Sequence, residues 1–540
     1  MSSSSELSKQ SQKSSSASSK GKGMAIATVL MIIGLILSKG SGFLRDIFVS
    51  IRFQSAEYRD AFTLAFVIPD FFFSLLVGGS IQAAITPSLS RAIERKEEKK
   101  GWRSISIFIT LMAIIMFCVV LIGVIFATPL YSLVNPDTDS EIVRMASNMS
   151  RALFPQIFFM MLAALLIGIL NAYKKFSSTA FGPTVYNICV LLAIILLGAT
   201  SEDALYLTGV GILGAAIVYF LFQLVMARKE IRNFRPNFAF KDPGFRKLLR
   251  LALPILISAS IVQLNMLVLN SFAGGFSEGS IYALRQASTL WQLPYGIFAV
   301  AVGNVMLPNL AAFAAARDTK GASRLLSSSL KNALFMTIPS AGLLFMLRYD
   351  VVMGLYSWSS AYTPENGRAV ATFLAGYCLA IITHTVIFIM NQAFYAVGET
   401  KIPLFAGLVT LISNFAFCMF FINAGMGPIS LTIAYSSTSV ITMTILCFIY
   451  SKNKALRPRG MIVFLMKSLV CLLSMIVVLL LIDFIPFEPS TKITSLLWLF
   501  VRAGIGIVTY FMTAWILKMH ELRVALDKVV SRLLRRKNHT

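Results

Sequence analysis

Long apolar runs recur along almost the whole chain and constrain its fold more than any other feature. The hydrocarbon core of a bilayer is about 30 Å thick, so a helix needs about 20 mostly apolar residues to cross it. Of the 540 residues, 57% are hydrophobic and only 13% are charged. Soluble domains carry about a quarter charged residues, which excludes one large water-soluble core. The sequence therefore predicts an all-α polytopic membrane protein with about 14 transmembrane helices. The predicted spans are 24–44, 60–86, 104–134, 149–173, 179–200, 205–227, 251–274, 281–312, 331–357, 367–396, 401–423, 428–451, 462–486 and 494–517.

The basic residues are distributed unevenly between these spans. There are 48 Lys and Arg residues against 24 Asp and Glu residues, for a net charge of +24. Either an acidic partner such as nucleic acid or a set of basic cytoplasmic loops would explain this balance. Most of the basic residues fall in alternate connections, such as 91–103, 228–250 and 452–459, whereas 135–141 on the other side is acidic. The positive-inside rule then predicts that both termini are cytoplasmic, and no nucleic-acid partner is expected.

The two ends of the chain differ from its apolar body. Residues 1–23 are Ser-rich and basic and lack large apolar residues apart from one leucine, which predicts a disordered cytoplasmic tail. Residues 518–540 place leucine and valine at helical spacing opposite a basic face. That pattern predicts an amphipathic cytoplasmic tail that lies on the anionic inner leaflet and binds membrane lipids.

The sequence offers no pattern typical of an enzyme. All six cysteines fall inside apolar runs without a CxxC pair, which is the pattern of small buried side chains rather than metal ligands. There is no nucleotide-binding loop and no hydrolase motif. We therefore expect no cofactor, no metal site and no catalytic residues.

Two pairs of segments indicate an internal repeat. Residues 66–92 resemble 291–314, each with a proline early in a span, a glycine-containing middle and a second proline near the exit. Residues 171–183 resemble 392–403 at nearly the same offset. A parallel repeat of this kind places a substrate path between two lobes. The predicted parts are an N-lobe at 24–228 (spans 1–6), a basic cytoplasmic linker at 229–250, a C-lobe at 251–451 (spans 7–12) and two further spans at 452–517.

Charged residues at the first two spans form the main candidate site. Ionisable side chains within a membrane are costly and mark function by default. Guanidinium and ammonium groups suit phosphate oxygens, so we predict a cationic pocket in which the acids hold the cations when no anion is bound. Two alternatives remain: snorkelling of the lysine to an interface, and placement of the arginine in an outer loop. The candidate substrate-binding residues are Ser38, Lys39, Arg45, Asp46 and Asp60.

Other ionisable residues lie in the second half of the chain. Arg285, near the start of the eighth span, is the sixth candidate, with an outer-interface anchor as the alternative. His384 is interpreted as a packing histidine, with a proton site as the less favoured hypothesis. Arg348, Lys467 and Arg502 are expected to be isolated interface residues.

The order of several short motifs resembles the MurJ/MviN family of lipid II flippases. SKGSGFLRD at 38–46 resembles the family's S-R-x-x-G-F-x-R-D, and DAFTLAFVIP at 60–69 resembles its D-A-F-x-x-A-F-x-x-P. LPYG at 293–296 and QAFYAVGETKIP at 392–403 resemble its L-P-x-G and its A-F-Y-A-x-x-D-T-x-T-P turn, and 154–187 resembles its fourth and fifth spans.

The resemblance implies a two-lobe exporter fold with two added C-terminal spans in a bacterial cytoplasmic membrane. It also implies that the chain moves lipid II, the undecaprenyl-pyrophosphate-linked muropeptide, from the inner to the outer leaflet by alternating access. Cell-wall synthesis proteins are possible partners. Ser38, Arg45, Asp46 and Asp60 match the family pattern, and Lys39 stands where an arginine is usual.

Two departures from the family pattern keep other functions open. Phe73 stands where a basic residue is usual, and the eighth-span A-D-R motif reads AST at 287–289, with Arg285 one turn away. The alternatives are an exporter of another polyprenyl-linked glycan, a drug or small-solute exporter of the same fold, and a non-transporting scaffold.

Overall fold

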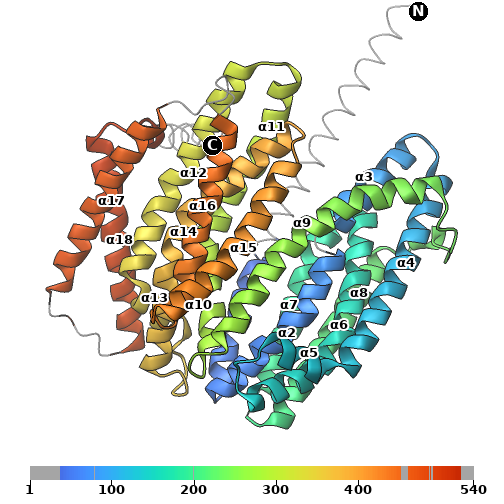
Figure 1. The fold of residues 1–540 in the computed structure, drawn as a ribbon, viewed down its shortest axis with the longest axis horizontal. Coiled ribbons are helices and arrows are strands. Elements are labelled where there is room, and N and C mark those ends of the chain that lie inside the picture. Colours follow the sequence, from blue (N-terminus) through green and yellow to red (C-terminus); the bar gives the residue numbers. More distant parts are fainter. Residues whose placement is uncertain are drawn as a thin grey trace, which may run out of the picture. The chain divides into compact units, whose positions relative to one another are not determined.

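The computed structural model describes residues 34, 37–77, 80–198, 200–451, 460–485, 487 and 491–523. Within these ranges every regular element is a helix (Figure 1). The predicted disordered tail at 1–23, most of the predicted first span at 24–44 and residues 524–540 of the predicted amphipathic tail lie outside the described residues.

The chain divides into two compact units, Met1–Gln263 and Leu264–Thr540. Unit 1 begins with a helical segment at 37–52. Its further helices are α2 (Ala56–Val77), α3 (Ser80–Glu94), α4 (Glu98–Ile125), α5 (Ala127–Val134), α6 (Ser140–Ala172), α7 (Phe176–Leu197), α8 (Glu202–Met226) and the short η1 (Ile231–Asn233). The boundary between the units falls inside α9 (Pro243–Ala273).

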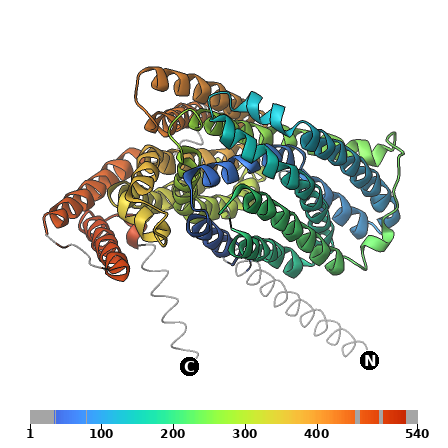
Figure 2. The ribbon, with the colours of Figure 1, turned by 90° about the horizontal axis from the view of Figure 1, so that it is seen from below.

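Unit 2 continues from the second half of α9. Its helices are α10 (Ser280–Pro294), the π-helix η2 (Tyr295–Val300), α11 (Ala301–Ala315), α12 (Thr319–Met346), α13 (Arg348–Tyr356), α14 (Pro364–Ala396), α15 (Lys401–Asn423), α16 (Ile429–Ser451), α17 (Met461–Asp483) and α18 (Lys492–Ile516). In both views α17 and α18 run side by side at one edge of this unit (Figure 1 and Figure 2).

The described helices carry most of the predicted spans. Eleven of them are long and apolar enough to cross a membrane, and α12 with α13 would make a twelfth if that bent pair is one span. The predicted span 251–274 coincides with α9, which is not among the eleven, and the first predicted span lies mostly outside the described residues. A polytopic membrane protein is confirmed, whereas the count of 14 stays a prediction.

Helix breaks at described residues divide the predicted spans 104–134 and 331–357. The predicted span 104–134 is divided at Phe126 into α4 and α5. The predicted span 331–357 is divided between α12 and α13, which meet at an angle of 79°. Apolar content reports only that a segment prefers lipid or protein to water, so it does not reveal where the helix axis turns.

Polar residues set the starts of several helices. The side chains of Asp139, Ser201 and Asp318 accept hydrogen bonds from backbone N–H groups in the first turns of α6, α8 and α12. Thr363 caps α14 in the same way, directly before a proline at the first helical position. These caps satisfy N–H groups that have no partner within the helix.

The two units pair their helices in the same order. In unit 1, α6 packs against α2, α3, α4, α5 and α8, and α7 packs against α8. In unit 2, α14 packs against α10, α11, α12, α13 and α16, and α15 packs against α16. This correspondence supports the predicted repeat.

The turns that end equivalent helices are also alike. After α3 the N–H of Glu97 donates to the carbonyl of Ala92 (2.8 Å), and after α11 the N–H of Asp318 donates to Phe313 (3.0 Å). The residue before each donor, Lys96 and Arg317, has positive φ (60° and 54°). A left-handed residue with this hydrogen bond is a common way to end a helix. The repeat therefore extends to the geometry of single turns.

Candidate functional site

Gly34 and the helical segment at 37–52 lie against α7 along a close-packed polar seam. A Cβ atom on Gly34 would lie 2.5 Å from the carbonyl oxygen of Ala180, so the backbones approach closely there. Further along, Asn187 Nδ2 donates to the carbonyl (3.1 Å) and the hydroxyl (3.5 Å) of Ser38. Small residues and amide side chains are typical of helix contacts in membranes. Ser38 therefore contributes to the packing between this helix and α7.

Arg45 and Asp46 form an ion pair on the same helix. Arg45 Nε and Nη2 both donate to Asp46 Oδ1, at 3.0 and 2.9 Å. The two side chains are 21% and 13% exposed. The guanidinium also interacts electrostatically with Tyr186 and Asp70. The structure thus places Arg45 inside a helix rather than in a loop, and it brings together two of the predicted site residues.

Aromatic and amide residues that the sequence did not single out line this region. Gln156 Nε2 on α6 donates to the hydroxyl of Tyr186 on α7 (2.9 Å). The Tyr186 ring lies 5.9 Å from the Tyr219 ring on α8. The available signal was a glutamine inside an apolar span, which carries weight only once α6 and α7 are known to adjoin.

The other predicted residues of unit 1 lie in different environments. Lys39 is exposed on the helix, whereas Asp60 on α2 is buried, at 2% exposure, beside the equally buried Arg59. Asp70, further along α2, is exposed. The role expected for Asp60, holding a cation in place, remains a prediction.

In unit 2 the sixth candidate, Arg285, sits half-buried on α10. Its carbonyl accepts a hydrogen bond from Thr289 (3.1 Å). The next residue, Gln286, is buried and accepts from the Tyr362 hydroxyl (3.1 Å). The structure thus places Arg285 on a helix of the second unit, and its proposed contact with substrate stays a prediction.

His384 packs among aromatic rings. Its imidazole stacks on Tyr435 with a centroid distance of 5.1 Å and an interplanar angle of 4°. The Trp291 ring lies 5.2 Å away. This geometry supports the interpretation of a packing histidine.

The prediction that Arg502 is isolated is wrong. Arg502 on α18 bonds to Asp350 on α13 (2.6 Å) and to Asp483 at the end of α17. Lys467 is not isolated either, since its ammonium donates to the carbonyl of Leu517 (2.8 Å). These partners are far apart in sequence, so no local pattern reveals them.

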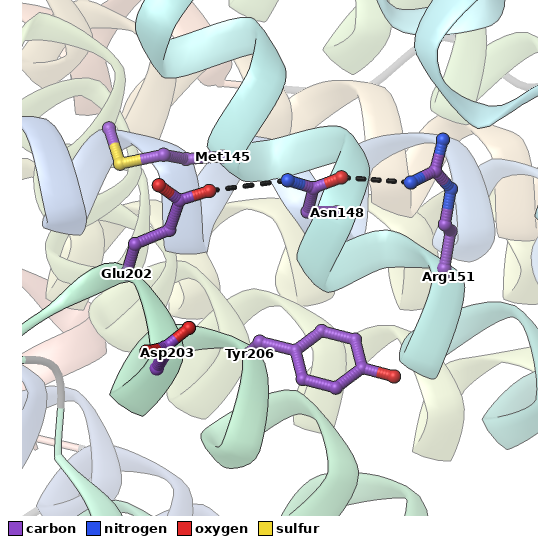
Figure 3. A pocket seen from close by; sticks show the side chains of 6 residues that line it. All are labelled: Met145, Asn148, Arg151, Glu202, Asp203 and Tyr206. Atoms are coloured by element: carbon purple, nitrogen blue, oxygen red, sulfur yellow. Dashed lines mark hydrogen bonds between the residues drawn. The ribbon is translucent and has the colours of Figure 1, made fainter.

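A polar pocket lies between the N-terminal part of α6 and the start of α8 (Figure 3). Its volume is about 260 Å³, and it is lined by Met145, Asn148, Arg151, Glu202, Asp203 and Tyr206. Arg144 bridges Glu141 (2.6 Å) and Glu202 (2.7 Å) beside it. Asn148, which begins an N-x-S sequence, lies within α6, and its amide donates to Glu202 (3.2 Å).

Neither region is built as a metal centre. Among the described residues, no group of three or more His, Cys, Asp or Glu side chains could hold a metal ion. What the Arg45 region offers chemically is a guanidinium held by a carboxylate and flanked by phenol and amide groups, which suits an oxyanion.

Comparisons with known proteins agree on one family. The family model described as Lipid II flippase MurJ matches residues 50–501. A probable lipid II flippase MurJ of Rickettsia prowazekii is 24% identical over 484 residues, which is 88% of this chain and 94% of the relative. The lipid II flippase MurJ of Burkholderia cenocepacia is 25% identical over 401 residues, covering 72% and 78% of the two chains.

Solved structures give the same result. A lipid II flippase MurJ in an inward closed conformation superposes with a TM-score of 0.76 at 25% identity, covering 91% of this chain and 98% of that one. An inward-facing multidrug resistance MATE transporter superposes with a TM-score of 0.68 at 14% identity, covering 79% and 98%. The second likeness shows a shared fold only.

Proposed function

The chain belongs to the lipid II flippase MurJ family, and from that premise we propose that it carries lipid II from the inner to the outer leaflet of a bacterial cytoplasmic membrane. The polar head group would pass through a cationic path between the two repeated lobes while the polyprenyl tail stays in the bilayer. Alternating access of the lobes would expose the head group first on one side and then on the other.

The observation that carries the proposal is the Arg45–Asp46 pair. An arginine within an apolar helix is costly, and a pyrophosphate is the kind of group that would compensate for that cost. While the site is empty, Asp46 neutralises the guanidinium. When a pyrophosphate arrives, its oxygens can take over the donors that now point to Asp46 Oδ1.

Lys39 and Arg285 are proposed as further contacts to the head group. Lys39 is exposed on the same helix as Arg45, so its ammonium is available as a point charge. Arg285 would supply a cation from unit 2 in place of the arginine missing from the motif at 287–289. Cell-wall synthesis proteins are proposed as partners on the family resemblance alone.

The missing eighth-span motif favours one alternative substrate, another polyprenyl-pyrophosphate-linked glycan. Both substrates share the pyrophosphate that Arg45 would bind, so they differ only in the sugar and peptide contacts. Proteoliposomes loaded with either lipid separate the two, because only the true substrate should become accessible to a glycan-modifying enzyme added outside.

The decisive test is complementation of a strain depleted of its own lipid II flippase. Wild-type protein should restore growth and outer-leaflet exposure of lipid II, whereas Arg45→Ala should fail at equal abundance in the membrane. Arg368→Ala, which removes an exposed cation at the start of α14, serves as the matched control and should grow normally. Full growth with Arg45→Ala would contradict the proposed role of the pair.

A further inference from the structure

The connection between α8 and α9 packs against α4 through backbone hydrogen bonds. Beyond η1, the backbone N–H of Arg235 donates to the Ser106 hydroxyl (3.3 Å), and that of Asn237 donates to the Thr110 hydroxyl (3.3 Å). From Arg235 to Asn237 an extended chain advances about 6.6 Å, and from Ser106 to Thr110 a helix advances about 6 Å. The loop and α4 can therefore run alongside each other over both hydrogen bonds. Figure 1 shows this segment beside α4.

Both ends of this loop, residues 231–242 (the linker loop), are fastened near the start of α4. Asn233 Nδ2 donates to Glu98 (3.4 Å), which also accepts from the Tyr173 hydroxyl. Burial and the Glu98 hydrogen bond raise the pKa of Tyr173 to about 12, so the hydroxyl remains a donor at neutral pH.

At the other end of the linker loop, Asp242 accepts from the Ser104 hydroxyl (3.0 Å) and from the backbone N–H of Phe245 (2.9 Å). It also pairs with Arg103 at 3.5 Å. The loop therefore descends along α4 to the level of Thr110 and returns to the level of Ser104.

The tip of the linker loop reaches the height at which the membrane should begin. α4 is 28 residues long, which is about 42 Å at 1.5 Å per residue. A span of about 20 residues counted back from the far end, Ile125, starts near Ser106. Asn237, bonded to Thr110, thus lies at or just inside the boundary of the hydrocarbon, and the residues that follow it share that depth.

In residues 228–250, which include the linker loop, the acidic and basic side chains differ in exposure. Glu230 is buried and pairs with Lys175 at 2.6 Å, and Asp242 has a side chain that is 13% exposed. Every lysine and arginine of the segment is exposed; these are Arg228, Lys229, Arg232, Arg235, Lys241, Arg246, Lys247 and Arg250. The acids fix the loop to the protein, while the outward charge is positive.

Two phenylalanines are exposed at the tip. Phe238 is 64% and Phe240 is 40% exposed, with ring centroids 6.4 Å apart, and Phe240 also contacts the buried Phe245 (6.2 Å). Aromatic rings beside basic side chains are the composition of segments that lie in a lipid headgroup layer. Packing within unit 1 does not account for an exposed Phe238.

We propose that the linker loop is a membrane-surface binding site for anionic phospholipids. Phe238 and Phe240 enter the headgroup layer, and the surrounding lysines and arginines bind lipid phosphates. Because the loop is fastened to α4, this contact fixes the depth of unit 1 in the leaflet. The inference is independent of which lipid-linked substrate the protein carries.

A depth measurement tests the first half of the proposal. An environment-sensitive fluorophore is placed at Phe238→Cys, or at Lys99→Cys as the matched control, in a full-length chain whose six native cysteines are replaced by alanine. Lys99 is exposed in the first turn of α4, about 10 Å further from the hydrocarbon than Ser106. In nanodiscs, lipids with a shallow doxyl group should quench the probe at 238 and leave the probe at 99 largely unquenched. Equal quenching at both positions would overturn the proposal.

Lipid retention tests the second half. Native mass spectrometry counts phosphatidylglycerol molecules that stay bound to the full chain after mild detergent treatment. Arg235→Gln with Lys241→Gln should weaken retention about five- to twenty-fold, because each cation at a surface contributes several-fold to binding of anionic lipid.

The control for lipid retention is the pair Lys320→Gln and Arg324→Gln, which removes two exposed cations from α12. It should retain phosphatidylglycerol as wild type does. If the two double variants lose lipid equally, or if the linker loop binds an acidic soluble protein or RNA in preference to phosphatidylglycerol vesicles, the proposal fails.

Discussion

One arginine–aspartate pairing of unit 1 lies within a single helix, whereas one of unit 2 connects several helices. In unit 1, Arg45 bonds to its chain neighbour Asp46, so this ion pair lies within one helix. In unit 2, Arg502 bonds to Asp350 and Asp483, so it joins α18 to α13 and to the end of α17. A long-range pair has an evident structural role. A hydrogen bond between chain neighbours within one helix does not connect distant elements in that way.

The same contrast appears in the neutral polar residues. In unit 2, Asn414 Nδ2 donates to Asn265 Oδ1 at 2.7 Å with both side chains buried, and His384 is enclosed by rings. In unit 1, Tyr186 accepts a hydrogen bond from Gln156 (2.9 Å) and interacts electrostatically with the Arg45 guanidinium. The two units share the order of helix packing, but their polar residues differ. The two units therefore share their helix packing and differ in the hydrogen bonds of their polar side chains.

Reversing the pair in unit 1 should have the largest effect. In Arg45→Asp with Asp46→Arg, the ion pair is kept, but the guanidinium moves by about 100° around the helix. Transport should fall by at least about tenfold, because a charge-assisted hydrogen bond to the substrate contributes roughly 1.5–3 kcal/mol. Complementation and lipid II exposure measure the loss. The melting temperature in detergent should stay near that of wild type, and a large drop would show that the pair is structural after all.

Breaking the pairing in unit 2 should give the opposite profile. Arg502→Met removes the partner of two carboxylates and unfastens α17 and α18 from α13. Since both acids are partly exposed, we expect a loss of about 2 kcal/mol rather than the larger loss typical of fully buried pairs. Thermal unfolding in detergent measures the change, with Arg368→Met as the control. Unchanged stability would remove the distinction between the two pairings.

A glycine substitution should give the smallest effect. Gly34→Ala places a Cβ atom 2.5 Å from the Ala180 carbonyl, so the first helix must shift away from α7. Overpacking costs about 1–3 kcal/mol, and we expect the low end of that range because the helix can shift as a whole. Gly40→Ala, with open space around the new atom, should be neutral. If both variants melt alike, the close seam that positions Arg45 is not required.

Much of the fold could be predicted, because the helices depend on patterns among residues close together in the sequence. Helix segments were found because about 20 apolar residues satisfy a bilayer whatever their neighbours are. The repeat was predicted because similar proline- and glycine-containing segments recur at nearly the same offset along the chain. The bend between α12 and α13 and the break at Phe126 were missed, because apolar content says nothing about axis direction.

Part of the candidate site could be proposed from the sequence for the same reason. Arg45 and Asp46 stood out because charges in an apolar run are rare. Tyr186 and Gln156 did not, since a tyrosine or glutamine in a span is ordinary until its neighbours are known. The partners of Arg502 were missed because they lie 19 and 152 residues away.

The sequence by itself determined the membrane class, the family and the alternation of basic and acidic connections, since each depends on residues counted along the chain. Only the tertiary structure decided which charges meet. It showed that Asp46 holds Arg45, that Arg502 fastens three helices and that the basic linker loop lies along α4 with its acids turned inward. The physical reason is that a side-chain contact requires two atoms within a few ångströms, and helix packing sets that distance between residues far apart in the chain.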